Sequence, residues 1–338
     1  MRSRMLRTVL GDIDNGQLGW CQCHEHLFLE EGKPLELGAS LCMDDYGKSL
    51  AEIKMYGAAG GRAFADAQPI WSGRRAEWME SASRESGVHI IASTGFHKHG
   101  FYYDGSEVFT KSEDELTEIF TDEIEKGMIS SKSDGEKRLK AKAGIIKVAV
   151  DKGGINATEA YTRLFHAAVN AAAETGAAIL AHFELGEDVF PLIRLMERAG
   201  LPPRRLLACH LDRTRHDAAY HKEVADSGAY LEYDTINRLK YISNEQELDL
   251  ICEMLEAGYE KKLLFSLDTT NERLRSYGAN MGLDYILSTF KGLLLSLIHI
   301  CTPLDIIAWR EIYTYLEKCA DTGEHIADVV ESVVMKNS

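Results

Sequence analysis

The chain has 338 residues, of which 45% are hydrophobic and 27% charged, and its formal net charge is −15. That charge argues against nucleic acid as a partner, because sequence-independent binding to nucleic acid needs a basic surface. No apolar run approaches the roughly 20 residues needed to cross a bilayer, and the N-terminus lacks the apolar core of a signal peptide. We therefore expect a cytoplasmic protein that uses no membrane partner. The seven scattered cysteines are typical of reduced thiols.

Short apolar runs alternate with helix-like stretches along the chain. The predicted strands cover residues 20–27, 62–66, 88–93, 144–149, 177–182, 206–210, 229–233 and 263–268. The predicted helices cover residues 75–86, 112–129, 158–175, 189–199, 217–226 and 245–257, several of them ending at a glycine. Eight strands alternating with helices predict an α/β fold, a (β/α)8 TIM barrel, formed as a single domain by residues 1–293.

Residue types that bind metals fall at the carboxyl ends of these strands, where such barrels carry their chemistry. His24 and His26 lie two apart on the first strand, so their side chains share one face. The later strands end near four more residues of this kind: Lys147, His182, His210 and Asp268. Each alone could be a packed histidine, a surface lysine or a helix cap, but the coincidence of all six favours a metal site.

Lys147 needs a separate explanation. A buried ammonium beside two divalent cations would be repelled and costly. A carbamate formed from this lysine and CO₂ would instead be anionic, and its two oxygens can bridge two metal ions. The alternative is a surface lysine on a misplaced strand.

Several motifs occur in a fixed order: HEHL at 24–27, TGFH at 94–97, GIIK at 144–147, CHLD at 209–212 and SLD at 266–268. In these motifs, from about residue 6 to 293, the chain resembles the phosphotriesterase-related family of the amidohydrolase superfamily. The resemblance implies one metal ion on His24, His26 and Asp268 and another on His182 and His210. It also implies that carbamylated Lys147 and a hydroxide bridge them. Zinc is the expected metal, with manganese or cobalt as alternatives.

Such a site predicts a hydrolase. Two adjacent cations lower the pKa of a shared water toward neutrality, and the resulting hydroxide attacks a carbonyl or phosphoryl group. Asp268 is the predicted catalytic residue that takes the proton and passes it to the leaving group.

Cationic residues follow the seventh and eighth strands, where barrels frequently bind phosphate. The candidate substrate-binding residues are Arg238, Lys240, Arg273, Arg275, Tyr277 and Lys98. They predict an anionic small-molecule substrate, although solvated surface charges are the alternative. The runs 275–278 and 95–98 resemble the sugar-lactonase members of the family, so a phosphorylated sugar lactone is the predicted substrate.

Other functions stay open at this point. An organophosphate triesterase or an acyl-homoserine lactonase would share the metal site. A TatD-like nuclease also uses His-x-His on a barrel, but it normally has glutamate where this chain has Lys147. A catalytically dead ligand-binding barrel is a further alternative, and a homodimer is compatible with the sequence without being specified by it.

The tail departs from the family pattern after Lys291. Residues 295–300 read LSLIHI, the hexapeptide obtained by translating a transposon-end adapter used in sequencing libraries. We expect residues 294–338 to be an atypical helical tail of chimeric origin, with a genuine apolar helix as the alternative.

Overall fold

The structure is a computed structural model that describes residues 5–298. Its centre is a sheet of eight parallel strands that lie side by side in sequence order. They are β3 (Trp20–Glu25), β4 (Gly61–Asp66), β5 (His89–Gly95), β6 (Ile145–Val150), β7 (Ala178–Phe183), β8 (Leu206–Cys209), β9 (Tyr230–Tyr233) and β10 (Leu263–Phe265). The sheet curls until its two ends meet, where the Asp268 N–H donates to the His24 carbonyl at 3.1 Å. The predicted TIM-barrel fold is confirmed.

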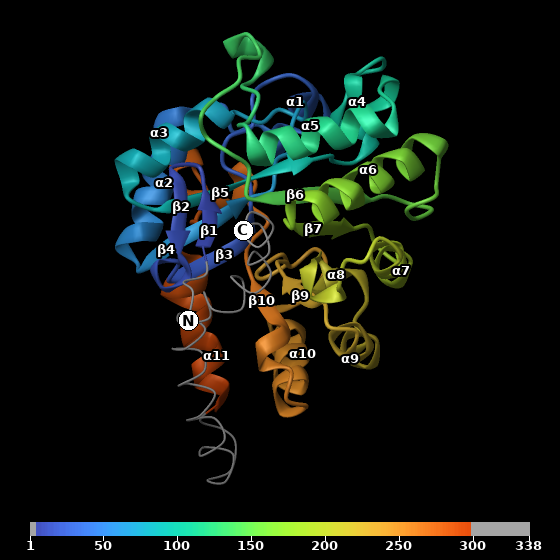
Figure 1. Ribbon diagram of the computed structural model, residues 1–338. Helices are drawn as coiled ribbons and strands as arrows, with labels where there is room; N and C mark the ends of the chain where they lie inside the picture. The colour runs from blue at the N-terminus through green and yellow to red at the C-terminus, as the bar shows by residue number, and fades with distance from the viewer. Residues whose placement is uncertain (1–4, 299–338) are drawn as a thin grey trace.

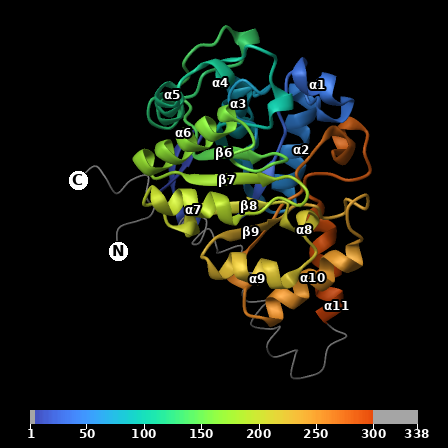
Figure 2. The ribbon, with the colours of Figure 1, turned by 90° about the vertical axis from the view of Figure 1, so that its right-hand side faces the viewer.

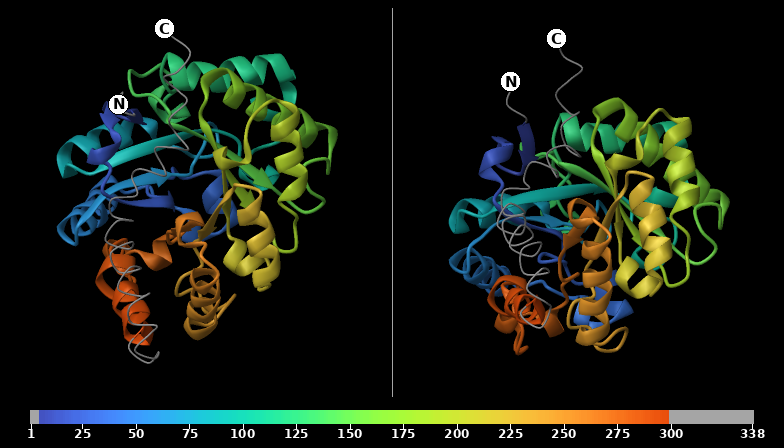
Figure 3. Two further views of the ribbon diagram at one scale, coloured as in Figure 1. Left: turned by 60° about the horizontal axis from the view of Figure 1, so that its bottom comes forward. Right: turned by 90° about the horizontal axis from the view of Figure 1, so that it is seen from below.

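Helices cover the outside of the sheet (Figures 1 and 2). The longer ones are α2 (Tyr46–Ala58), α3 (Ala76–Ser86), α5 (Glu113–Glu125), α6 (Glu159–Thr175), α7 (Phe190–Arg198), α9 (Ala218–Asp226), α10 (Asn244–Glu256) and α11 (Lys291–Ile298). The views from below show α10 and α11 next to each other at the end of this outer layer (Figure 3). Shorter helices, α1 (Lys33–Leu37), α4 (Glu107–Thr110) and α8 (Leu211–Thr214), lie in the connections. No helix within residues 5–298 is long and apolar enough to span a membrane.

The helix ends follow from local side-chain chemistry. Ser112 and Glu115 form a reciprocal capping box at the start of α5. Thr158 accepts a hydrogen bond from the Tyr161 amide at the start of α6, and Gly176 ends that helix in the left-handed conformation. The first two caps fix where α5 and α6 begin, and Gly176 fixes where α6 ends before β7.

The barrel interior is filled by small and aliphatic side chains. Ala63, Ala65, Leu180 and Cys209 point into it and are buried. Leu6 joins the same cluster from an antiparallel hairpin of β1 (Met5–Thr8) and β2 (Gly11–Asp14). A packed interior leaves the carboxyl ends of the strands as the place for a polar site.

The structure differs from the sequence expectations in a few elements. The hairpin and α2 were not predicted. His210 and Asp268 do not end strands but follow β8 and β10, and both have left-handed backbones, with φ of 66° and 47°. Most of the predicted atypical tail, residues 299–338, lies outside the described residues.

Candidate metal centre

The carboxyl ends of five strands bring the six predicted ligand residues together. The Lys147 amine lies 3.0 Å from Nε2 of His24. Nε2 of His26 lies 3.5 Å from Oδ1 of Asp268. The ring of His210 is 4.8 Å from that of His24 and 4.3 Å from that of His182, measured between centroids. Residues separated by up to 244 positions along the chain therefore form one cluster.

Burial sets the protonation of this cluster. It lowers the pKa of His26 to about 4 and holds the pKa of His24, His182 and His210 well below the usual value. The imidazoles are therefore neutral at pH 7, which is the form that binds metal ions. Lys147 is fully buried, and burial lowers the pKa of its amine as well.

The donor atoms present fit divalent metal ions. Nε2 of His182 and Nε2 of His210 are buried without a hydrogen-bond partner among the described residues. Buried polar atoms rarely lack a partner, and a cation would supply one here. Oδ1 of Asp268 faces Nε2 of both His24 and His26, at 3.8 and 3.5 Å. Imidazole nitrogens with a carboxylate oxygen form a set that suits zinc.

Two further carboxylates lie behind the histidines. Oδ1 of Asp234 is 2.5 Å from Nδ1 of His210. Nδ1 of His24 lies 3.5 Å from Asp234 and 3.6 Å from Glu232. A carboxylate on Nδ1 holds the proton there and leaves Nε2 free to bind a metal ion. Burial raises the pKa of Asp234 to about 7 and that of Glu232 to about 8.

A cavity of about 280 Å³ opens above the cluster. Four of its lining side chains are cationic: Lys98, Arg213, Arg238 and Lys240. Arg213 and Arg238 both contact Oδ2 of Asp268, at 3.2 and 3.1 Å. Lys98 donates to Glu184 at 2.7 Å. His26, His182 and Asp268 also line the cavity, so a molecule bound there would touch candidate metal ligands.

Three of the predicted substrate-binding residues lie outside the lining of this cavity. Arg273 is buried and donates to the carbonyls of Ile236 and Asn237, because its turn folds back against the loop after β9. Arg275 pairs with Asp284 at 3.3 Å, and the Tyr277 hydroxyl lies 2.8 Å from that of Ser49. Their roles in substrate binding stay predictions from sequence.

Four residues of the site were not predicted from the sequence. Asp234 directly follows β9, so the rule that found the other strand-end residues could have found it. Arg213 is on α8 rather than at a strand end, so that rule could not have found it. The Tyr241 ring packs against both Arg213 and Lys240, with 4.9 and 4.7 Å from cation to ring centroid. Glu232 lies within β9, where it reads as an ordinary strand residue.

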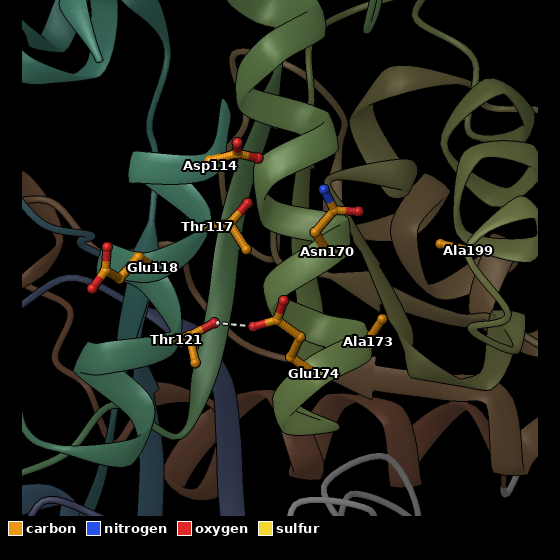
Figure 4. Close-up of a pocket in the computed structure, with 8 residues that line it drawn as sticks. All are labelled: Asp114, Thr117, Glu118, Thr121, Asn170, Ala173, Glu174 and Ala199. Atoms are coloured by element: carbon orange, nitrogen blue, oxygen red, sulfur yellow. Dashed lines mark hydrogen bonds between the residues drawn. The ribbon is translucent and has the colours of Figure 1, made fainter. Parts of the chain in front are cut away.

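A second hollow, of about 500 Å³, lies between α5 and α6 on the outside of the barrel. Figure 4 shows its lining, in which the Thr121 hydroxyl donates to Glu174 at 3.1 Å. Asp114 and Glu118 add two more carboxylates. The lining contains no histidine, lysine or arginine, so we assign the chemistry to the barrel cavity.

Comparisons with known proteins agree with this geometry. Residues 4–296 match the model of the Phosphotriesterase family. A phospho-furanose lactonase of Mycoplasmopsis synoviae is 30% identical over 306 residues, 87% of this chain and 86% of that protein. A Listeria monocytogenes lactonase structure superposes with a TM-score of 0.80 at 27% identity, covering 87% of this chain and 92% of the other. The structure of the phosphotriesterase homology protein of Escherichia coli, solved with phosphate in its active site, superposes with a TM-score of 0.75 at 26% identity. The superposition covers 86% of this chain and 96% of the other. The chain therefore belongs to the phosphotriesterase family of the amidohydrolase superfamily.

Proposed function

We propose that this chain is a binuclear metal-dependent lactonase whose substrate is a phosphorylated sugar lactone. One observation carries the proposal: four neutral imidazoles, Asp268 and a buried lysine converge beneath a cavity with a cationic wall. The names of the relatives support it, since two of them are lactonases and a third binds phosphate in its active site.

The family resemblance assigns the candidate ligands to two metal ions. His24, His26 and Asp268 would hold one ion, and His182 and His210 the other. Bound there, two divalent cations would acidify a shared water and polarise the lactone carbonyl.

Lys147 is suited to carry the carbamate between the two sides. Burial disfavours its ammonium form, and the neutral amine keeps a lone pair that can attack CO₂. Attack forms an N–C bond and releases one proton, so the side chain becomes an anion.

Asp268 is suited to move a proton. Burial alone would raise its pKa, but the guanidinium groups of Arg238 and Arg213 hold the pKa well below its usual range. The carboxylate therefore starts ionised and can accept a proton from the attacking water. Because the two arginines stabilise the ionised form, it passes that proton to the leaving oxygen rather than keeping it.

The cavity wall favours an anionic substrate. Its lining residues include four cations but only one carboxylate, Asp268. Lys240 has no carboxylate partner within the described residues, and its amine lies over the Tyr241 ring. A neutral triester or a greasy acyl lactone would leave these charges unmatched, whereas a phosphate group would pair with them.

Kinetics of Lys240→Met test this proposal, with Lys54→Met on the outer helix α2 as the control. For a phosphorylated sugar lactone we expect KM to rise roughly tenfold, which corresponds to about 1.4 kcal/mol, with little change in kcat. For the dephosphorylated lactone, KM should not change. Equal effects on both substrates would refute the phosphate contact. Wild-type protein that binds metal but turns over no lactone would favour a dead barrel instead.

A further inference from the structure

The two ends of the sheet meet at a seam between β3 and β10, and side chains hold this seam together. Glu25 on β3 is the main contributor. Its Oε1 accepts the amide of Leu267 at 2.8 Å, and its Oε2 accepts the amide of Thr269 at 3.2 Å. The carboxyl group of Glu25 is therefore hydrogen-bonded to the backbone on both sides of Asp268.

Asp268 needs such support. Its φ of 47° is in the left-handed region, which a residue with a side chain adopts only when its surroundings impose it. Its own N–H donates to the His24 carbonyl at 3.1 Å. The backbone at residues 267–269 is thus fixed against β3 by three consecutive amides.

Thr269 adds a second link across the seam. Its hydroxyl oxygen accepts the His26 amide at 3.0 Å and donates to the His26 carbonyl at 2.9 Å. The seam therefore joins His24 and His26 directly to Asp268. His182 and His210 belong to β7 and to the turn after β8, and the hydrogen bonds of Glu25 do not reach them.

We propose that Glu25 is a positioning residue for the metal ion held by His24, His26 and Asp268. Its carboxylate fixes the distance between β3 and the turn at 267–269, and so presets three ligands of one ion but none of the other. This inference rests on the proposed metal pair. Glu25 is completely buried, and each of its two oxygens accepts one backbone N–H, so the positioning role rests on these two hydrogen bonds.

Metal retention by Glu25→Gln in the full chain provides the test. A glutamine keeps the size but turns an NH₂ group toward one of the two amides, so one hydrogen bond is lost. Glu247→Gln is the matched control, because Glu247 is a buried glutamate on α10 whose oxygens have no hydrogen-bond partner within residues 5–298. Each protein is loaded with Zn²⁺ or Co²⁺ and dialysed against a chelator. Metal is then counted by mass spectrometry, and the Co²⁺ absorption spectrum is recorded.

We expect the wild type and Glu247→Gln to retain two ions and Glu25→Gln to retain one. The affinity for the lost ion should fall roughly 10- to 100-fold, the range found when supporting hydrogen bonds around a metal ligand are removed. Excess metal should then restore kcat, which a merely structural defect would not allow.

Two results would overturn the proposal: retention of both ions with wild-type affinity, or equal weakening of both. Wild-type protein that binds no ion would overturn the proposed function itself, which is a distinguishable outcome. If Glu25→Gln does not fold, Thr269→Val provides the test instead, since it removes the hydrogen bonds between the Thr269 hydroxyl and the His26 backbone. Retention of both ions by Thr269→Val would then count against the proposal.

Discussion

At the scale of single residues, the two oxygens of Asp268 have different surroundings. Oδ1 faces the imidazoles of His24 and His26, and Oδ2 faces the guanidinium groups of Arg213 and Arg238. One oxygen is therefore placed to bind a metal ion while the other stays within reach of the cavity. This division explains how a single carboxylate can serve as ligand and proton carrier.

Replacing Asp268 by asparagine should lower kcat by roughly 10²- to 10⁴-fold, the usual contribution of a positioned acid or base. The amide keeps an oxygen for the metal but cannot take up the proton. Steady-state kinetics with metal content measured on the same sample checks this, and Asp249→Asn on the exposed face of α10 is the control. Near-normal turnover by Asp268→Asn with two ions bound would rule out the proton role.

The sequence indicates the candidate metal ligands because each combines a suitable residue type with a position at or just after a strand end. It does not identify Arg213 or Tyr241, since their contact with the site depends on how α8 and the loop after β9 fold. Loop folding also explains why Arg273 and Arg275 do not line the cavity although they are close to Asp268 in sequence. Arg273 donates to a backbone carbonyl, and Arg275 pairs with Asp284. Loop residues lack the periodicity that places strand residues.

At the scale of elements, most strands were predictable because they are buried on both faces and read as apolar runs, although β3 reads WCQCHE. Helix α2 was not, because its buried face includes Ser49 and Glu52 beside Leu50, Ile53 and Tyr56. Glu52 accepts the amides of Ser276 and Leu283, which are more than 200 positions away. A buried glutamate of this kind interrupts the apolar periodicity by which a helix is predicted, and its burial is explained only by its tertiary partners.

A buried ion pair joins three elements of the barrel. Arg74, before α3, donates to Glu123 on α5 at 2.8 and 2.5 Å and to the carbonyl of Ser93 on β5 at 2.7 Å. Arg74→Met should lower the free energy of unfolding by about 3–5 kcal/mol, because it removes the cationic partner of the buried Glu123. Urea denaturation measures this.

Arg84→Met is the matched control, since Arg84 is exposed and pairs with Glu80 only at the surface. Such a pair contributes about 0–1 kcal/mol. Equal stability changes for Arg74→Met and Arg84→Met would contradict the assigned role of the buried pair.

At the scale of the whole molecule, burial of titratable groups makes stability depend on pH. Burial raises the pKa of Glu232 and Asp212 to about 8 and that of Asp234 and Asp66 to about 7. The native chain thus keeps protons that the unfolded chain releases near pH 4, and stability falls as pH rises toward 8. The buried imidazoles act in the opposite direction, but only below their unfolded pKa of about 6.5.

The metal-free protein should therefore be less stable at about pH 8.5 than at about pH 6.5. Urea unfolding in the presence of a chelator measures the difference. Glu232→Gln, which is neutral at every pH, should make the dependence shallower. Stability that increases over this range would show that these carboxyl groups are already ionised in the native metal-free chain.

A crystal structure of the protein grown with Zn²⁺ and bicarbonate would test the central claim most directly. We expect two ions, identified by anomalous scattering, one on His24, His26 and Asp268 and the other on His182 and His210, with a carboxyl group on Nζ of Lys147. An unmodified Lys147 amine with no ion among these residues would contradict the account.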